Sequence, residues 1–373
     1  MMEFVRNCAV SALFALAACS AQAEAPQAPE TLKLTPEQQE QQYKLALAEA
    51  QKLPPPMRDM PFMAGVAGND VVHASTLGVI VREAVRARNF TALDQMEAYL
   101  LESHSRLPGG TSELDSFHRA LNRQVYASSD SSVPCDLSGI SFAKDWEKRE
   151  PQQPAAFITE AALLLDHAWC IRGGDDASTV APEAWAPFRE NVDAAYRVLA
   201  SHAEVAKQDP EYYALMERIY TAQERSADEF QRLLDEGSAR APYYYAIYFN
   251  AASHARPQWG GSGEEVDRIA RYAMAHTRKE DGAGAYARVY WDLADCGCDL
   301  GEYPIDVKLL AQAMDDVMAR TPSDFDAAHF AMLACRLDEP ELAAKQFARG
   351  GKNANFWDDT DELGDCLYFT GVQ

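Results

Sequence analysis

The sequence predicts an all-α protein, built as a tetratricopeptide-like or α-solenoid stack of helix pairs. Apolar residues recur at helical spacing through most of the chain after residue 77. Helix start and stop signals stand at short intervals between these apolar runs. Alternating apolar and polar runs joined by hairpin turns, which would indicate β-strands, are scarce.

Residues 1–23 predict a signal peptide for export. Their apolar run is too short to span a membrane but suits a secretory signal. The segment that ends at Cys19 resembles a bacterial lipoprotein signal, which would put a lipid on this cysteine, and Ser20 does not favour retention in the inner membrane. Alternatively, residues 21–23 fit ordinary signal peptidase, with cleavage before Glu24. We therefore expect a periplasmic protein, and in the first case an outer-membrane lipoprotein.

The rest of the chain divides into three predicted regions. Residues 24–34 are polar and predict a flexible linker. Residues 35–295 are expected to form a helical repeat-like domain, with Pro36 in its first helical turn. Residues 296–373 predict a cysteine-rich helical extension packed on the same stack. The glycine-broken apolar stretch at 54–76 fits no regular element.

Each later helix has a recognisable start or end. Helices are predicted over residues 78–90, 90–107 and 112–126. A stronger candidate begins at Pro154 and ends at Gly173, because proline suits the first turn and glycine the end of a helix. Further starts are predicted at Pro182, at Asp209-Pro210 and at the capping box Ser226-x-x-Glu229.

Residues 323–350 give the clearest helix pair. Ala343 and Phe347, four residues apart, resemble the pattern of small residue and phenylalanine in the second helix of a tetratricopeptide repeat. Residues 212–237 predict a similar pair. Copies at a regular period are not visible, so we expect a degenerate array.

The chain is strongly acidic. It has 57 Asp and Glu against 34 Lys and Arg, a formal net charge of −23. This charge repels phosphate backbones and argues against a nucleic-acid partner. It can serve solubility alone, or it can attract a protein or peptide partner with a basic face.

Disulfide bonds are expected because an exported protein meets oxidising conditions. The chain has eight cysteines, of which Cys8 lies in the signal and Cys19 is the lipidation candidate. The six disulfide candidates are Cys135, Cys170, Cys296, Cys298, Cys335 and Cys366. Their order suggests one bridge between the first two and pairing among the other four, although sequence alone does not resolve the pairing. The spacing of Cys296 and Cys298 is typical of neither a zinc knuckle nor a redox motif.

Four segments together resemble a known family. They are RNFTALD at 88–94, the helix at 154–174, RPQWGGSGEEVDRIARYA at 256–273 and GAGAYARVYWDL at 282–293. In this order they are similar to the bacterial family known as domain of unknown function 4034, over roughly residues 75–295. The resemblance implies an all-helical, tetratricopeptide-like fold in bacterial proteins, many of them exported. It implies no activity.

The most specific of these pieces is the Trp-Gly-Gly-Ser loop. Gly260 and Gly261 permit a sharp turn, and Ser262 with Glu265 forms a capping box, so the loop predicts a helix start. Trp259 would anchor that start to the core. A phosphate-binding loop is the alternative, but acidic rather than basic residues follow the glycines.

An aromatic stripe follows Pro242. Tyr244 and Tyr248 would share one face of a helix, where aromatic stripes usually pack in a core. Because Trp259 is close in sequence, these three residues are also candidates for a partner-binding groove.

No catalytic motif stands out. The eight histidines are scattered, and neither a His-Glu-x-x-His zinc motif nor a Gly-x-Ser-x-Gly elbow is present. We therefore predict no catalytic residues, no metal and no cofactor. The leading hypothesis is an exported, lipid-anchored, non-catalytic protein that binds a protein or peptide in the bacterial cell envelope. The alternatives are an immunity-type inhibitor of a secreted toxin and an envelope hydrolase with an unrecognised site.

Overall fold

The computed structural model describes residues 70–107, 110–127, 135–174, 177–357 and 359–372. In this part of the chain sixteen α-helices form and no β-strand does, apart from an isolated bridge between Arg106 and Ser112. The all-α prediction is therefore confirmed. Residues 1–23 with Cys19, the linker at 24–34 and the helix start at Pro36 lie outside the described residues.

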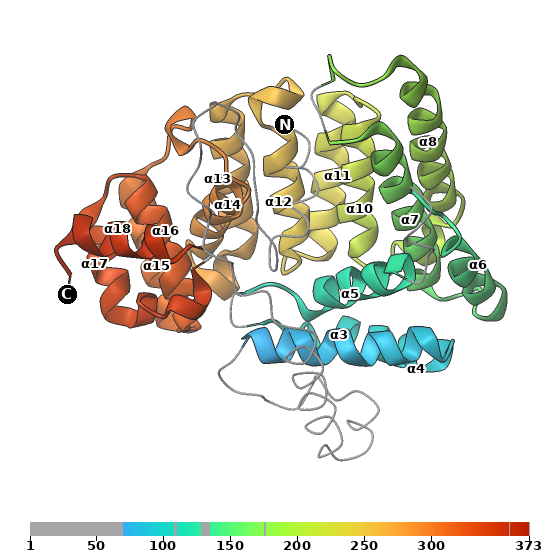
Figure 1. Ribbon diagram of the computed structural model, residues 1–373, viewed down its shortest axis with the longest axis horizontal. Coiled ribbons are helices and arrows are strands. Elements are labelled where there is room, and N and C mark those ends of the chain that lie inside the picture. The colour runs from blue at the N-terminus through green and yellow to red at the C-terminus, as the bar shows by residue number, and fades with distance from the viewer. Residues whose placement is uncertain (1–69, 108–109, 128–134, 175–176, 358, 373) are drawn as a thin grey trace, which may run out of the picture.

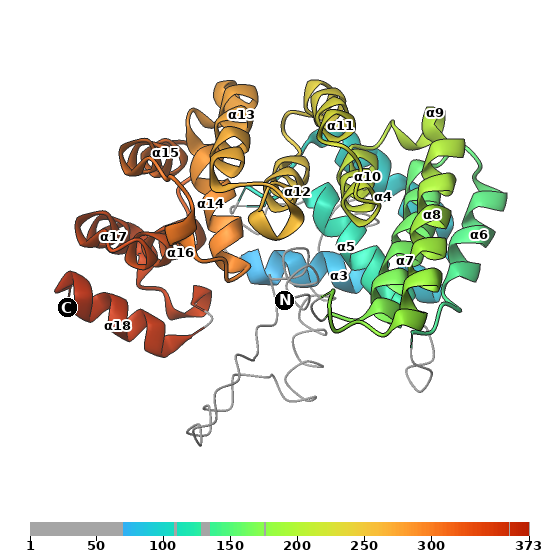
Figure 2. The same cartoon turned by 90° about the horizontal axis from the view of Figure 1, so that it is seen from above.

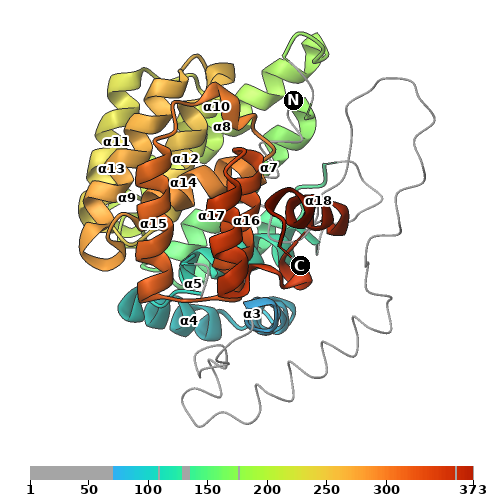
Figure 3. The ribbon, with the colours of Figure 1, turned by 90° about the vertical axis from the view of Figure 1, so that its left-hand side faces the viewer.

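The first three helices form a layer of their own. They are α3 (Asp70–Arg86), α4 (Phe90–Ser103) and α5 (Glu113–Ala127). In Figure 1 these helices lie across the lower ends of the other helices, and Figure 3 shows the same arrangement from the side.

The remaining helices form an array of packed pairs. They are α6 (Ile140–Arg149), α7 (Pro154–Arg172), α8 (Trp185–Ser201), α9 (Ala203–Ala206), α10 (Glu211–Ala222), α11 (Ala227–Arg240), α12 (Tyr245–His254), α13 (Gly263–Asp281), α14 (Gly284–Asp295), α15 (Val307–Arg320), α16 (Asp324–Arg336), α17 (Pro340–Gln346) and α18 (Thr360–Thr370). Figure 2 shows that they follow an arc, with α10, α12, α14 and α16 on its inside and α11, α13 and α15 on its outside. Neighbouring inner helices pack against one another and against their outer partners, which makes a stack of helix pairs.

Local signals explain where several helices begin and end. Helix α7 begins at Pro154, and Gly173 follows its last residue with a positive φ of 80°. At the start of α11, Ser226 and Glu229 form the reciprocal capping box that the sequence predicts. In the 323–350 unit, Ala343 and Phe347 are both buried, as expected for a repeat-like second helix.

The Trp-Gly-Gly-Ser loop is a helix start, as predicted. The hydroxyl of Ser262 accepts a hydrogen bond from the backbone N–H of Glu265 at 3.2 Å and caps α13. Gly260 has a φ of 89°, and a side chain at Gly261 would collide with the backbone carbonyl of Ala255. Both glycines are therefore required by the turn itself.

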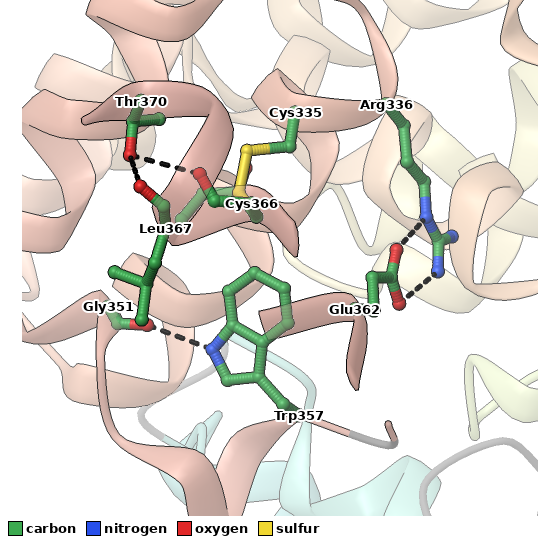
Figure 4. The surroundings of a disulfide bond; sticks show 9 residues. Cys335, Arg336, Gly351, Trp357, Glu362, Cys366, Leu367 and Thr370 are labelled. Atoms are coloured by element: carbon green, nitrogen blue, oxygen red, sulfur yellow. Dashed lines mark hydrogen bonds and ion pairs between the residues drawn. A yellow bond between two sulfur atoms is a disulfide. The ribbon is translucent and has the colours of Figure 1, made fainter. Parts of the chain in front are cut away.

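Two predicted disulfides are present. Cys135, ahead of α6, is bonded to Cys170 on α7, and Cys335 on α16 is bonded to Cys366 on α18. Figure 4 shows the second bridge beside Trp357. These bonds tie together segments that are 35 and 31 residues apart in the chain.

The prediction that Cys298 takes part in a disulfide is wrong. Cys296 belongs to a disulfide, but Cys298 keeps a free thiol. The physical reason lies in what surrounds this thiol. The Nη1 of Arg256, a residue that is 1% exposed, donates a hydrogen bond to the Cys298 Sγ at 2.7 Å. This contact holds the thiol in its reduced form among the described residues.

Candidate functional site: a buried polar layer

A layer of charged and polar side chains separates the N-terminal helices from the array. One side of this layer comes from α4, α5 and the loop between them, and the other side comes mainly from the ends of α10, α12, α13, α14 and α16. We call it the polar layer. Its members are Glu97, Arg106, Asp115, His118 and Arg119 on the first side, and Asp209, Glu211, Tyr244, Tyr245, Asp281, Arg288 and Asp326 on the second.

The innermost part of the layer is a group of three residues. His118 on α5 places its Nε2 atom 2.7 Å from Oδ2 of Asp209, which precedes α10. Glu97 on α4 adds a carboxylate, and one atom from each of the three residues lies within 4.8 Å of the others. Glu97 and Asp209 are 0% exposed and His118 is 6% exposed. We call Glu97, His118 and Asp209 the buried trio.

One carboxylate oxygen of Glu97 and one of Asp209 are hydrogen-bonded to groups outside the trio. The amide of Gln153, just ahead of α7, donates a hydrogen bond to Oε2 of Glu97. Oδ1 of Asp209 accepts a hydrogen bond from the backbone N–H of Glu211 at 2.8 Å, at the first turn of α10. Asp209 therefore helps to begin α10, as the Asp209-Pro210 signal predicts. The contact between its second oxygen, Oδ2, and His118 was not predicted from the sequence.

Burial and charge act together on the trio. Burial alone would raise the pKa of Asp209, but the charge and hydrogen bond of His118 outweigh it and hold this pKa below its usual range. Burial also opposes the charged form of His118, yet the facing carboxylate of Asp209 raises the His118 pKa. Burial and then repulsion from Asp209 raise the pKa of Glu97 well above its usual range. These shifts favour the charged forms of His118 and Asp209 and the neutral form of Glu97.

A second group in the layer is built around Arg288. This side chain on α14 is 1% exposed. Its Nη1 donates to Oδ1 of Asp326 at 2.9 Å, and its Nε lies 3.7 Å from Oδ2 of Asp281. Arg106 contacts Asp281 from the other side at 3.4 Å. A side chain at Gly110 would overlap the Arg288 guanidinium, so the loop passes directly over it. Opposite charges are matched inside this group, as buried charges require.

The predicted aromatic groove does not form. Tyr244 and Tyr248 are both 0% exposed, so the prediction that they line a groove for a partner is wrong. The Tyr244 hydroxyl donates to Oε2 of Glu211 at 2.6 Å and joins the polar layer, and the Tyr248 hydroxyl donates to the carbonyl of Pro242. Trp259, the last residue of a short 3-10 helix, is only partly buried. The tyrosine stripe packs in the core, the usual position for helical aromatics.

Sequence reasoning missed the buried trio, although a faint signal was present. Glu97 interrupts the apolar stripe of α4 between Leu93 and Leu100, and His118 follows Phe117 on the buried face of α5. A charged residue on an apolar face indicates a buried partner. Local sequence patterns do not identify Asp209 as the partner of His118, because the two residues are 91 positions apart in the chain.

A different kind of surface lies on α18 at the end of the array. Among the described residues the exposed large apolar side chains are Tyr368 and Phe369, which are 91% and 44% exposed. Asp361 and Asp365 are exposed on the same helix, and residues at i, i+4 and i+7 share one helical face. Asp361, Asp365, Tyr368 and Phe369 therefore form an acidic and aromatic stripe, which we call the α18 stripe.

The rest of α18 is firmly attached. Arg336 on α16 forms two hydrogen bonds to the carboxylate of Glu362, at 2.7 and 3.1 Å, next to the Cys335–Cys366 bridge (Figure 4). Cys366 and Leu363 are buried against the array. The exposed aromatics thus stand on a fixed helix.

No protein-family model matches the chain, and no curated protein or solved structure does. The resemblance to the domain of unknown function 4034 family stays a prediction that rests on the four segments quoted above.

Proposed function

We propose that this chain is an exported, lipid-anchored protein of the bacterial cell envelope that binds a protein or peptide with a basic face. Two features support the proposal. The disulfides of the described residues are typical of proteins that fold under oxidising conditions. Stacked helix pairs offer extended surfaces for partners. No helix in the described part of the chain is both long and apolar enough to cross a membrane.

The observation that carries the proposal is the α18 stripe. Large apolar side chains of the described residues are otherwise buried or partly buried, but α18 exposes Tyr368 and Phe369. Neighbouring exposed aromatic side chains are typical of interaction surfaces. Exposed tyrosine on a rigid helix is typical of contact surfaces, and Asp361 and Asp365 beside it favour a partner of positive charge.

The toxin-inhibitor hypothesis is a special case of this proposal. An acidic inhibitor finds a basic toxin quickly because opposite charges steer the encounter. The acidic composition and the acidic side of the α18 stripe both support it. Loss of the gene should then sensitise cells to sibling or rival cells, and unchanged survival would count against an inhibitor.

The hydrolase alternative has less support. The group of the described residues that most resembles catalytic machinery is the buried trio, and its side chains are at most 6% exposed. A substrate would have no access to them in this conformation. We therefore place the function at the surface and not in the polar layer.

Site-specific crosslinking tests the proposal. A photoreactive phenylalanine analogue at Tyr368 should capture a discrete basic partner in living cells. Reversing the charge of Asp361 and Asp365 to lysine should reduce that product by about tenfold or more, since buried interface charges carry large energies. The control places the analogue at Lys279, which is 93% exposed on a different helix. Equal products at both positions, or a product unaffected by charge reversal, would contradict the proposal.

Export is tested separately. Mass analysis of the mature N-terminus after detergent extraction distinguishes acylated Cys19 from cleavage before Glu24. A Cys19→Ser variant should become soluble in the periplasm. A variant that stays membrane-bound would remove the lipid anchor from the proposal.

A further inference from the structure

We propose that Glu97, His118 and Asp209 form a binding site for one divalent transition-metal ion, with Zn²⁺ as the best match. This inference is independent of the proposed function, because the buried trio lies in the polar layer and the α18 stripe does not. The donor set is one imidazole nitrogen and two carboxylates, a combination that zinc takes in proteins. The imidazole argues against calcium and magnesium, which prefer oxygen ligands alone.

The spacing of the donors suits such an ion. One ligating atom from each residue lies within 4.8 Å of the other two. Ligands about 2.1 Å from a tetrahedral zinc ion are separated by about 3.4 Å from one another. The 2.7 Å contact between His118 and Asp209 and the 4.8 Å limit lie on either side of that value, so small side-chain rotations would bring the three donors to zinc-binding distances. Three protein ligands leave a fourth position for water.

An independent observation concerns one carboxyl oxygen of Glu97. The Oε1 atom of Glu97 is buried and has no hydrogen-bond partner among the described residues. The same side chain is 0% exposed and faces the carboxylate of Asp209. Two buried carboxyl groups side by side require either a shared proton or a bound cation. Because no donor reaches Oε1, the Glu97 carboxyl either shares a proton with Asp209 or binds a cation.

The surroundings already orient the ligands. Gln153 holds Oε2 of Glu97, and the backbone N–H of Glu211 holds Oδ1 of Asp209. Outer-shell hydrogen bonds of this kind fix the ligating oxygens of metal sites. Each carboxylate therefore has one oxygen held by the protein, and the second oxygen of Asp209 faces His118.

The location gives the metal a structural role. The three ligands come from α4, α5 and the turn ahead of α10. A metal ion here would fasten the N-terminal helices to the array across 91 residues of chain. Its binding energy would then contribute to folding.

The test uses the mature chain, stripped with a chelator and titrated with Zn²⁺ alone. We expect one high-affinity site per chain by calorimetry and a higher melting temperature in the presence of zinc. The Glu97→Gln variant keeps the shape of the side chain, and its amide can donate to Asp209, so it should fold without metal. It should bind zinc more than about tenfold more weakly and lose the thermal shift.

Two further variants complete the design. His118→Gln should also lose zinc binding, whereas His254→Gln should keep it. His254 is a matched control because it is partly buried and hydrogen-bonded to Thr221, but it lies outside the trio. Absence of a single strong site in the wild type, or equal binding by wild type and Glu97→Gln, would overturn the proposal and leave a trio that shares a proton.

Discussion

Arg288 shows how a single residue secures the polar layer. Its guanidinium is matched by Asp326 and Asp281 and is covered by the backbone at Gly110. Replacing it with alanine would leave two aspartates buried without their main cation. We expect Arg288→Ala to lower the free energy of unfolding by about 3–5 kcal/mol, the usual consequence of breaking a buried pair on one side. Urea denaturation measures this change.

The control for this prediction is Arg86→Ala. Arg86 forms an ion pair with Glu83 one helical turn away, and both side chains are exposed. Pairs of this kind contribute about 0.5 kcal/mol or less. If both arginine variants lower the free energy of unfolding by a similar amount, the burial of Arg288 does not increase its contribution to stability.

The raised pKa of Glu147 predicts that the stability of the folded protein depends on pH. Burial, then the hydrogen bond and charge of Glu160, raise the pKa of Glu147 to about 8. The folded protein therefore keeps a proton that the unfolded chain releases from about pH 4.5 upward. The contribution of the Glu147–Glu160 contact to the free energy of unfolding is therefore fully present below pH 4.5 and is lost as the pH rises toward 8. Glu147→Gln carries a permanent donor, so it should avoid the loss.

The measurement compares unfolding free energies at pH 4.5 and pH 8.5. At the higher pH, Glu147→Gln should be more stable than wild type by about 1–2 kcal/mol, after allowance for partial exposure. At the lower pH the two should agree. Glu150→Gln, an exposed change just after the same helix, is the control. A difference between wild type and Glu147→Gln that does not vary with pH would rule out the shared proton.

At the scale of elements, α18 depends on its attachments. It has 11 residues, which is too few for a stable isolated helix in water. The Cys335–Cys366 bridge closes a loop between α16 and α18 and is worth about 2–4 kcal/mol. Replacing both cysteines with serine should therefore increase amide hydrogen exchange in α18 while α7 stays protected. Mass spectrometry of exchanged peptides measures both helices in one experiment.

Cys298→Ser provides the comparison, because it removes a free thiol and no bridge. It should leave exchange in α18 unchanged. Equal protection of α18 in the wild type and the double serine variant would show that Arg336 and the buried face of the helix are sufficient to hold it.

Elements are also the scale at which sequence is most informative. The ends of α7 and the caps of α11 and α13 depend on residues a few positions apart, so Pro154, Gly173 and Ser226 were enough to predict them. The Cys135–Cys170 bridge followed from order along the chain. The free thiol of Cys298 did not, because its neighbour Arg256 reaches it through tertiary packing.

The candidate site was less predictable for the same reason. Tyr244 and Tyr248 carry a pattern that fits either a core or a surface stripe, and only the position of α12 inside the arc decides between them. The buried trio joins residues from three elements, so no window of sequence contains it. Exposure of Tyr368 depends on how α18 packs against α16 and α17, which local pattern does not reveal.

At the scale of the whole molecule, the N-terminal layer changes how the array should unfold. In a simple solenoid each repeat contacts only its neighbours, so local damage stays local. Here the loop and helix from Arg106 to Arg119 cross the ends of several array helices. Arg106 reaches Asp281 across 175 residues, and His118 reaches Asp209 across 91. These contacts should couple distant repeats into one cooperative unit.

Arg106→Ala tests this coupling. Arg106 lies over the Tyr245 ring at 5.0 Å and pairs with Asp281, so its loss weakens the contact of the loop with both α12 and α13. We expect amide exchange to rise together in α5, α12, α13 and α14, with a loss of about 1–3 kcal/mol in their shared opening free energy. Arg271→Ala is the matched control, since Arg271 lies on α13 but pairs with Asp267 one turn away and with Asp306. The control should affect α13 and the start of α15. If Arg106→Ala also raises exchange only beside the substituted residue, the array unfolds repeat by repeat and the layer is a passive cover.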